Sequence, residues 1–572
     1  MRSLAWYAKR LRVMRPGEVL HRVGEQYVLK TLQIKHRFRR ISASTSIVDH
    51  RRFSFCDGFA SKLPELPWSF ETNGIVSDAL LSGKVNALGC DWVWRPEDAV
   101  WHQAPDTHMV WPQFFFGRVP YHPGNPYGDI RIAWEPSRLQ HLIALALLAR
   151  GAQPAIRERA VALLSAQLLS WVDANPFLTG IHYVSAMECG LRILAVCHAM
   201  DLARETRLVP DSAWNALTRL VRAHAEFIGK RVSTHSSAGN HTIAEAAALV
   251  YVGVLFPEMA GADRWKTLGL SLLEQEADRQ ILPDGGGAEQ AWWYQWFIVD
   301  LYGLVVTLLR HRQHSVPGVI YDAYHRGRGF LSAFADTPRG LPQIGDGDQG
   351  YALSPFLRLS QPNNAWTQGV NVFDDAGYSV IRAGDGERAR LIFDHGPLGL
   401  APCYGHGHAD ALSVLFRLGR QEILIDPGTY TYNGDPRWRA YFRGTSAHNT
   451  VTVDDLDQAV QETAFLWSHP FDAERVRFEQ ASNGVVRVLA CHDGYARRLG
   501  VTHWRAVVFQ PPGCWLIWDR LTGARTHRVR LHWHLGIEPI RRAGRYLLQA
   551  KDRTVHLAVD GGDQSLHRGE TD

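Results

Sequence analysis

The chain has 572 residues, of which 46% are hydrophobic and 21% are charged. This length predicts two or more domains, and this apolar content excludes an intrinsically disordered chain. The formal net charge of +5 is modest, and no basic run coincides with a nucleic-acid-binding motif, so the sequence disfavours nucleic acid as a partner and permits an acidic one.

The N-terminal region is basic and amphipathic, and it contains no apolar run long enough for a signal peptide. No transmembrane segment is expected, because no stretch of about 20 apolar residues is evident. We interpret the region as a pair of surface helices broken near Pro16, since Glu18 and Glu25 interrupt the basic face. The alternative is peripheral contact with an anionic membrane. The predicted location is therefore cytoplasmic or membrane-peripheral.

Residues 1–128 predict a helical start followed by irregular loops, since the part from Trp68 to Tyr127 is rich in Pro, Gly and Trp. Residues 129–340 change to helical apolar spacing with short polar connections. The helices expected there are Ser137–Ala149, Ile156–Val172, Val184–Ala203, Ser212–Ile228, His241–Leu255, Arg264–Ile281 and Tyr294–Leu309. Consecutive helix hairpins without a fixed sequence repeat favour an incomplete α/α toroid over a solenoid.

Residues 341–572 change again, to alternating apolar and polar positions separated by turn residues. The main strands expected are Tyr378–Arg382, Arg390–Phe393, Leu412–Leu418, Glu422–Ile425, Thr450–Val453, Arg475–Phe478, Val485–Ala490, Thr502–Phe509 and Val529–His534. This pattern predicts an antiparallel β-sandwich. The fold class is therefore multidomain α+β, with an incomplete N-terminal α/α toroid followed by a C-terminal antiparallel β-sandwich and a ligand crevice between them.

The first candidate site segment is the helix start at Asn240 and His241, which follows Ala238-Gly239 and precedes Glu245. Packing considerations alone make Asn240 a helix N-cap. The functional interpretation is an amide that donates to a substrate carboxylate near a helix N-terminus, where anions are favoured.

The second segment is a glycine run, Gly285–Gly287, which is predicted to end one helix and start the next at Glu289. Tyr294 then lies in the first two turns of that helix. A tyrosine in a helix beside Trp293 is more often a core residue than a catalyst, so this segment alone does not indicate chemistry.

The third segment brings His406, His408, Asp426 and His448 into a short part of the β-region. Histidines two residues apart on an extended loop point to opposite sides, so His406 and His408 are expected to have different roles. His408, Asp426 and His448 form a nitrogen and oxygen ligand set that suits Zn²⁺. The seven cysteines are scattered and lack CxxC spacing, which argues against a thiolate site.

Three arginines, Arg437, Arg439 and Arg443, precede His448. A guanidinium can grip a carboxylate or a sulfate through two parallel hydrogen bonds. The alternative is a solvated edge strand or loop with no role in binding.

In their joint order and spacing these segments resemble the heparinase II/III-like polysaccharide lyases. The resemblance runs from roughly residue 129 to residue 455 and is carried by Asp129-Ile-Arg-Ile-Ala-Trp-Glu135 with Arg138, Met187–Arg192, Asn240-His241, Asp284-Gly with Glu289 and Tyr294, His406–Asp410, Asp426-Pro-Gly and His448-Asn. It implies an α/α toroid paired with a β-sandwich. The chain departs from the family pattern at Gly239, where members often carry a second Asn.

The resemblance also implies roles for individual residues. Asn240, Tyr294 and His406 are expected to be catalytic, with His241 as a supporting group. Substrate contacts are expected from the set Arg443, Glu289, Glu245 and Trp293. A structural zinc is expected at His408, Asp426 and His448, and no organic cofactor is expected.

The implied activity is that of a carbon–oxygen lyase, which cleaves a uronic-acid-containing acidic polysaccharide by β-elimination and leaves an unsaturated uronate end. This chemistry leads us to expect the phenol of Tyr294 and the imidazole of His406 to face each other across a cleft wide enough for a sugar chain. Relatives of this type are usually exported, so the periplasm is the alternative location.

Two other functions remain open from the sequence. A glycoside hydrolase on an α/α toroid requires two carboxylates beside the scissile bond, which Glu188, Glu245 and Glu289 offer. A non-catalytic polysaccharide-binding or assembly protein of an exopolysaccharide pathway is the second alternative.

Overall fold

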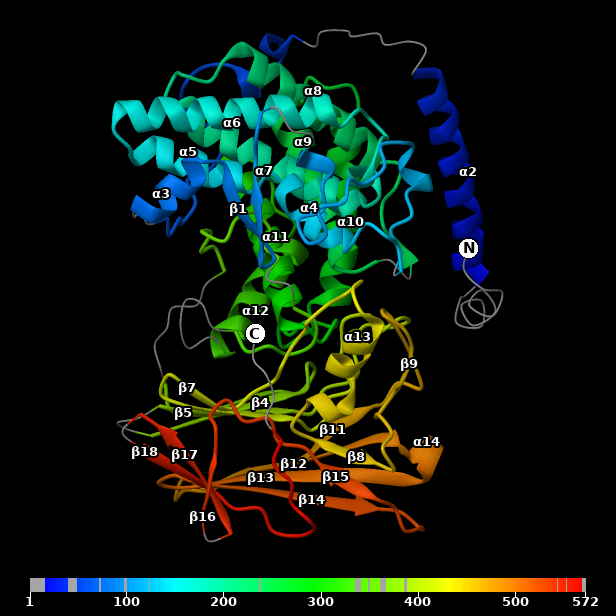
Figure 1. Ribbon diagram of the computed structural model, residues 1–572, viewed down its shortest axis with the longest axis vertical. Helices are drawn as coiled ribbons and strands as arrows, with labels where there is room; N and C mark the ends of the chain where they lie inside the picture. Colours follow the sequence, from blue (N-terminus) through cyan, green and yellow to red (C-terminus); the bar gives the residue numbers. More distant parts are fainter. Residues whose placement is uncertain are drawn as a thin grey trace.

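In the computed structural model the chain builds a helical half and a β half, stacked along the longest axis of the molecule (Figure 1). The structure describes residues 16–39, 49–70, 74–96, 100–122, 124–235, 238–334, 341–347, 350–360, 367–384, 388–542, 544–551 and 553–567. The domain boundary predicted at residue 340 falls just outside these ranges, as does the first of the two predicted N-terminal helices.

The helical half consists of two rows of helices. The inner row contains α5 (His141–Gly151), α7 (Ala186–Arg204), α9 (Asn240–Leu255) and α11 (Trp292–His311), and each of these packs on the next. The outer row contains α6 (Pro154–Ala174), α8 (Asp211–Ile228), α10 (Ala262–Gln280) and α12 (Gly318–Phe334). The inner helices are mostly apolar and largely buried, which is why they form the centre of the array, although α7 also buries charged side chains such as Glu188 and Arg192. This is the predicted α/α toroid.

One inner helix corrects the expectation that no long apolar stretch exists. By length and composition α11 could cross a membrane, but 83% of its most apolar window is buried inside the protein. Its apolar character is that of a core helix, packed between α9 and α12. Several short or peripheral helices were not predicted. Among them are α12, α3 (Gly74–Leu81), which lies in the irregular N-terminal region with β1 (Lys84–Ala87) and β2 (Cys90–Val93), and α4 (Ile130–Ser137), which follows that region.

The β half is a sandwich of two antiparallel sheets. The first sheet has the order β3 (Gly369–Phe373), β4 (Tyr378–Ala383), β5 (Ala389–Asp394), β6 (Val414–Leu418) and β7 (Gln421–Leu424). The second has the order β11 (Ala473–Gln480), β12 (Val486–Tyr495), β13 (Val501–Gln510) and β14 (Cys514–Thr522). Leu391 and Val414 of the first sheet pack on Val488 and Val507 of the second, so the predicted sandwich is confirmed.

Shorter strands complete the β half. They are β8 (Val451–Val453), β9 (Val460–Thr463), β10 (Leu466–Ser468), β15 (Val529–Leu531), β16 (Ile540–Arg542), β17 (Arg545–Ala550) and β18 (Arg553–Leu557). Gly419 and Arg420 form the predicted two-residue turn between β6 and β7. The segment of the three arginines is neither strand nor loop: it forms the helix α13 (Pro436–Arg443).

The two halves share one hydrophobic core. The face of the first sheet that points away from the second sheet packs on α11 and α12, where Tyr378 contacts Trp292 at 5.1 Å between ring centroids. The Tyr378 hydroxyl donates to Gln290 Oε1 at 2.7 Å, and Gln290 Nε2 donates to the Ala376 carbonyl at 3.0 Å. These buried contacts fix the start of α11 against the β half, which matters because α11 carries Tyr294.

An N-terminal helix, α2 (Pro16–Arg39), lies along the edge of the helical half (Figure 1). It begins at Pro16, where the fixed backbone angle of proline suits the first turn of a helix. Leu32 on its inner side is buried in the main core. The second predicted surface helix is therefore confirmed.

Candidate active site

One buried carboxylate, that of Asp346, gathers the polar side chains of the site. His406 Nδ1 donates to its Oδ2 at 3.1 Å, and His408 Nε2 donates to its Oδ1 at 3.0 Å. The Arg439 guanidinium bonds both oxygens, at 2.5 and 2.7 Å. The Thr429 hydroxyl adds a bond of 2.9 Å.

These partners keep Asp346 ionised. Burial alone would raise the pKa of this carboxyl, but the Arg439 guanidinium and the two imidazole donors hold the pKa well below its usual range. An ionised carboxylate only accepts hydrogen bonds, so each imidazole nitrogen that faces it carries a proton. It follows that the second nitrogens, Nε2 of His406 and Nδ1 of His408, are the ones left for other chemistry.

The phenol of the toroid lies directly on the imidazole of the β half. The rings of Tyr294 and His406 stack at 4.1 Å between centroids with 29° between their planes. Both side chains are partly exposed, whereas Asp346 and Arg439 beneath them are buried. Trp292 N donates to the Ile344 carbonyl at 3.1 Å, which ties the start of α11 to the segment that carries Asp346.

This stacking corrects one expectation. We predicted that Tyr294 and His406 face each other across a cleft wide enough for a sugar chain, and instead they are in contact. The reason is that Asp346 anchors His406 on a segment already bonded to α11. The phenol and the imidazole therefore present one shared surface to a ligand.

A second phenol, Tyr432, completes the group. Its hydroxyl lies 3.1 Å from that of Tyr294. The Arg131 guanidinium lies 4.0 Å from the centroid of the Tyr432 ring, and the Arg439 guanidinium lies 4.7 Å from it. Two cations near the face of one aromatic ring stabilise it electrostatically. Because Arg131 comes from α4 and Arg439 from α13, both halves of the molecule hold Tyr432 in place.

Glycine between the two histidines is required by close packing of the chain. A Cβ atom on Gly407 would lie 1.6 Å from the carbonyl oxygen of Leu398. The Gly407 carbonyl accepts from Trp467 Nε1 at 3.0 Å. The His-Gly-His sequence thus allows His406 and His408 to reach the same carboxylate from a loop pressed against the protein.

The amide of Asn240 is bonded to Glu289. Asn240 Nδ2 donates to both carboxylate oxygens, at 3.3 and 3.0 Å, and its backbone N–H donates at 3.0 Å. Asn240 is 1% exposed, and its side chain does not cap α9, so the interpretation as an N-cap was wrong. A Cβ atom on Gly239 would lie 2.2 Å from Glu289 Oε1. Only glycine at position 239 leaves room for the carboxylate of Glu289, which lies in the turn before α11.

His241 and Glu245 flank this amide on α9. His241 is half-buried; burial, together with the nearby His406 imidazole, lowers its pKa to about 4, so it is neutral at neutral pH. Glu245 is fully buried and accepts from the Ser233 backbone N–H at 2.6 Å and from its hydroxyl at 2.7 Å. The predicted contact between Glu245 and substrate was wrong, because this carboxyl is enclosed and holds the loop before Asn240.

Two other predicted substrate contacts need correction. Arg443 is fully buried, and its guanidinium donates to the backbone carbonyls of residues 405, 463 and 464. Burial lowers the pKa of Arg443 to about 9. Trp293 is 8% exposed and stacks on Trp296 at 5.5 Å. Both side chains are committed to packing, so neither is open to a ligand.

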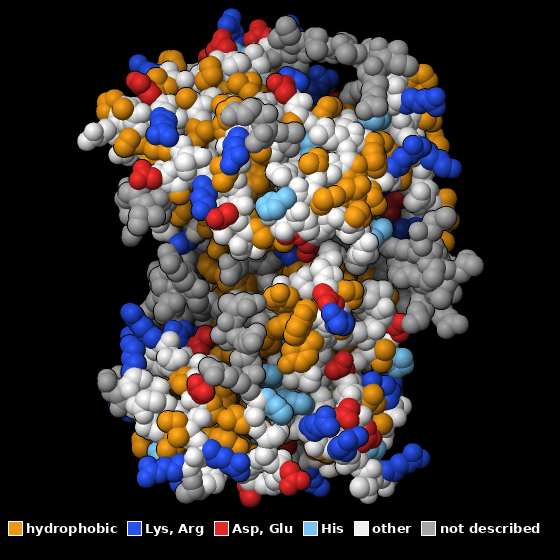
Figure 2. Space-filling model, in the orientation of Figure 1, with side chains coloured by type: hydrophobic (Ala, Val, Ile, Leu, Met, Phe, Trp, Pro, Cys, Tyr) orange, Lys and Arg blue, Asp and Glu red, His pale blue; other side chains and the backbone are white. Residues whose placement is uncertain are grey.

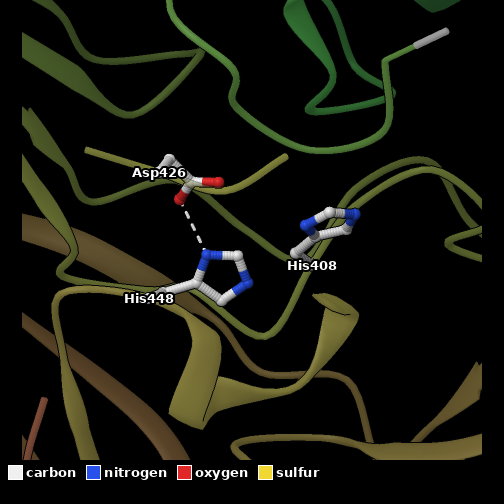
Figure 3. A group of neighbouring side chains, drawn as sticks. All are labelled: His408, Asp426 and His448. Atoms are coloured by element: carbon white, nitrogen blue, oxygen red, sulfur yellow. Dashed lines mark hydrogen bonds and ion pairs between the residues drawn. The ribbon is translucent and has the colours of Figure 1, made fainter. Parts of the chain in front are cut away.

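The three predicted metal ligands are close together. One ligand atom from each of His408, Asp426 and His448 lies within 4.8 Å of the others, and all three residues are buried. His408 Nδ1 and His448 Nε2 point into the same space (Figure 3), and neither has a hydrogen-bond partner among the described residues. Two imidazole nitrogens and a carboxylate oxygen are ligand types that Zn²⁺ binds in structural sites, so these three residues would hold such an ion.

The surroundings of these three residues also suit a metal. The His408 nitrogen that faces away from the group donates to Asp346, and a carboxylate behind a ligating histidine fixes the ring and its tautomer. His448 Nδ1 donates to Asp426 Oδ2 at 2.7 Å. The donor set, the two unpartnered buried nitrogens and the carboxylate behind His408 therefore fit a structural Zn²⁺.

Sequence reasoning missed Asp346 and Tyr432. Asp346 lies in Ile344-Gly-Asp-Gly347, and a short acidic glycine-rich stretch reads as a loop rather than as an anchor. Tyr432 follows Tyr430 in a segment without regular secondary structure. The one available signal was the position of both residues within the span of the family resemblance.

Comparison with known proteins agrees with this architecture. A family model described as "Heparinase II/III N-terminus" matches residues 98–347, and one described as "Heparinase II/III-like, C-terminal" matches residues 367–571. The fold and the paired phenol and imidazole define a protein of the class that joins an α/α toroid to a β-sandwich. The chain belongs to the heparinase II/III-like family.

Individual relatives are distant. The chain is 24% identical over 335 residues to a heparin-sulfate lyase of Pedobacter heparinus. This alignment covers 53% of this chain and 47% of that protein. The chain is 23% identical over 328 residues to a heparin-sulfate lyase of Bacteroides stercoris, covering 53% and 46%. The chain thus spans about half the length of these relatives.

Solved structures share the fold. The crystal structure of a heparinase III superposes with a TM-score of 0.63 at 18% identity, over 91% of this chain and 83% of that one. A heparan sulfate lyase from Pedobacter heparinus superposes with a TM-score of 0.51 at 17% identity, over 92% and 79%. The toroid followed by a β-sandwich is therefore an architecture that these proteins have in common.

Replacement of Glu245 should change how the free energy of unfolding depends on pH, and this change tests whether the carboxyl is buried. Burial raises the pKa of this carboxyl to about 8 from an ordinary 4.5, so between these values the folded protein holds a proton that the unfolded chain releases. The free energy of unfolding therefore falls as pH rises across this window. Glu245→Gln removes the effect, and the slope should differ by up to about 1.4 kcal/mol per pH unit.

Thermal unfolding between about pH 5 and pH 8 measures this difference. Glu226→Gln, at a more exposed carboxylate paired with Arg222, is the control and should follow the wild type. If the stability of Glu245→Gln and that of the wild type vary with pH in the same way, the carboxyl is not enclosed as described.

Proposed function

We propose that this protein is a polysaccharide lyase that cleaves a uronic-acid-containing polymer by β-elimination. The observation that carries the proposal is the contact between the partly exposed rings of Tyr294 and His406, above a buried carboxylate that fixes the imidazole. A binding protein has no need of a phenol and an oriented imidazole on one shared surface. The heparin-sulfate lyases among its relatives support the same class of reaction.

The proposed reaction needs a base, an acid and a stabiliser of negative charge. The base removes the proton at C5 of the uronate, the electrons of that C–H bond form the C4=C5 double bond, and the bond from C4 to the linking oxygen breaks. The acid then gives a proton to that oxygen. Groups positioned for such transfers typically accelerate a reaction by 10²–10⁴-fold.

Tyr294 and His406 take the two proton-transfer roles. Asp346 holds the proton of His406 on Nδ1, so Nε2 is the nitrogen that can accept the C5 proton. The Tyr294 hydroxyl lies 3.1 Å from that of Tyr432, whose ring lies near the guanidiniums of Arg131 and Arg439. We propose that Tyr294 takes the proton from one uronate epimer and returns it to the leaving oxygen, and that His406 takes it from the other epimer.

Asn240 supplies the group that stabilises the developing charge on the uronate carboxylate. Its amide is oriented toward a carboxylate, that of Glu289. We propose that the substrate carboxylate enters beside Glu289 and replaces it as the partner of this amide. A donor fixed in advance at the position where charge develops lowers the barrier without reorganisation.

The alternative hydrolase is less well supported. It requires two carboxylates free to act on the scissile bond. Glu188 is fully buried and bonded by the Arg138 guanidinium at 2.9 Å, Glu245 is bonded to Ser233, and Glu289 is bonded to Asn240. All three carboxylates offered by the sequence are therefore engaged within the protein.

Tyr294→Phe is expected to lower the rate of product formation by about 10²–10⁴-fold, because it removes the proton-transferring hydroxyl and leaves the ring in place. A panel of uronate polymers, including heparan sulfate and alginate, measures the activity through ultraviolet absorbance of the unsaturated product. Tyr546→Phe is the control, since that hydroxyl bonds Gln564 in the outer β half. Equal rates for Tyr294→Phe and the wild type would rule out the proposed role.

We further propose that His408, Asp426 and His448 bind a structural Zn²⁺. When bound, such an ion contributes folding free energy by holding its ligands together. Of the three proposed ligands, His408 lies on the same loop as His406 and two positions from it. Contacts that hold His408 therefore also hold the loop that carries His406. The proposal rests on their proximity and on the two unpartnered imidazole nitrogens.

His448→Ala is expected to abolish zinc binding and to remove the gain in melting temperature that the ion gives the wild type. Saturation at about 100 times the dissociation constant stabilises a folded protein by about 2.7 kcal/mol. Elemental analysis after dialysis and thermal unfolding with and without zinc measure both effects. His527→Ala, at a histidine paired with Asp454, is the control. Wild-type protein that retains no zinc and gains no stability would overturn the site.

We also propose that α2 rests on an anionic membrane surface. Its outer side carries a stripe of five large apolar side chains that are 56–74% exposed: Leu20, Val23, Tyr27, Ile34 and Phe38. Three exposed cations, Lys30, Lys35 and Arg37, flank the stripe, and Glu25 is paired with Arg22 at 2.7 Å. An apolar stripe bordered by cations suits the interface of an anionic bilayer. This contact favours the membrane-peripheral location over the alternatives.

Ile34→Ser in α2 is expected to weaken binding to anionic phospholipid vesicles by about 10- to 150-fold, since burial of one large apolar side chain is worth about 1.5–3 kcal/mol. Co-sedimentation with anionic and with neutral vesicles measures it. Ile540→Ser replaces a similarly exposed isoleucine on β16 and should bind as the wild type does. Wild-type protein that stays in the supernatant with both vesicle types would contradict the contact.

A further inference from the structure

The helix α13 has an unusual distribution of side chains. Its buried residues are the two arginines, Arg439 and Arg443, whereas Trp438 is 49% exposed and Tyr441 is 44% exposed. A surface helix normally buries its apolar side and exposes its charges. In α13 this order is reversed, because Arg439 is needed beneath the site and Arg443 binds backbone carbonyls. The aromatic side chains are left facing solvent.

These side chains form one continuous surface, which we call the aromatic platform and define as Tyr430, Trp438, Tyr441 and Phe442. Tyr430 is 58% exposed and stacks on Phe442 at 5.6 Å with 25° between the rings. Trp438 lies 6.0 Å from Tyr430 and 6.1 Å from Tyr441. Figure 2 shows apolar side chains gathered over the region of α13, just below the waist between the two halves.

The fold does not account for the exposure of the platform. Large aromatic side chains contribute to stability by leaving water, and three of these four remain in it. A contiguous exposed apolar patch typically marks a surface that binds a ligand or a partner. The ring contacts among the four residues keep the patch in one arrangement without covering it.

The platform lies close along the chain to residues of the candidate active site. Tyr430 lies two residues before Tyr432, whose hydroxyl bonds that of Tyr294, so their Cα atoms are at most about 7 Å apart. Arg439, one residue after Trp438, bonds Asp346 beneath His406. A chain that occupies the site and extends over α13 therefore meets the platform next.

We propose that the aromatic platform is a binding subsite for sugar units of the polysaccharide next to the unit that reacts; this rests on the proposed lyase function. The chemistry is stacking of the apolar C–H faces of sugar rings on flat aromatic rings. Arg437, the exposed arginine of α13, is already paired with Asp435 at 2.6 Å, so the subsite recognises ring faces rather than the charges of the polymer. It distinguishes a long chain from a short one and tolerates variation in the acidic groups.

Binding measured without turnover tests the proposal. Isothermal titration of the Tyr294→Phe protein with heparan sulfate and with alginate gives dissociation constants for long chains, and a tetrasaccharide of each polymer serves as the short ligand. Adding Trp438→Ala should weaken binding of the long chain roughly 3- to 10-fold, the typical effect of one aromatic contact. The short ligand, held mainly at the site, should be affected less. The loss should be the same at low and high salt, because stacking is not screened by ions.

Trp518→Ala is the matched control, because Trp518 is also 49% exposed but lies on β14 of the second sheet. It should leave both dissociation constants unchanged. An equal loss for long and short ligands, no loss at all, or a change in oligomeric state caused by Trp438→Ala would overturn the subsite. If the wild type forms no unsaturated product and Trp438→Ala still weakens binding of the long chain, the lyase proposal fails and the subsite stands.

Discussion

The ionised carboxylate of Asp346 is the constraint on which the site depends. It is inaccessible to solvent, and removal of a carboxylate from water is costly unless charged donors surround it. Arg439 supplies the opposite charge, and two imidazoles and a hydroxyl supply the remaining donors. Because each donor must point at the same two oxygens, one residue sets the orientation of the proposed base, of a proposed metal ligand and of α13.

This constraint also joins the two halves of the molecule. The segment that carries Asp346 is bonded to the first residue of α11, and the groups that bind Asp346 come from the β half. The toroid tyrosine and the sandwich histidine are therefore brought into contact rather than held apart. Tyr432 extends the same connection, because its ring contacts a guanidinium of α4 and one of α13.

The sequence predicted the fold well where a periodic pattern reports on burial. The inner helices and most of the sandwich strands follow from apolar spacing. The family resemblance led us to expect Tyr294 and His406 at one site, although with a cleft between them rather than in contact. It failed for α13, where the buried face is made of arginines, so a rule that places apolar residues inside points the wrong way. It also failed for Asp346 and Arg443, since only the three-dimensional fold reveals which charged residues are buried together.

Neutron diffraction from crystals of the wild-type protein in heavy water tests the central claim most directly, because it locates the exchanged protons around Asp346. We predict deuterium on His406 Nδ1 and on His408 Nε2, and none on either oxygen of Asp346. Deuterium on the Asp346 carboxyl, together with a missing deuterium on His406 Nδ1 or His408 Nε2, would contradict this prediction. In that case the carboxylate would not fix the free nitrogen of His406 toward a substrate.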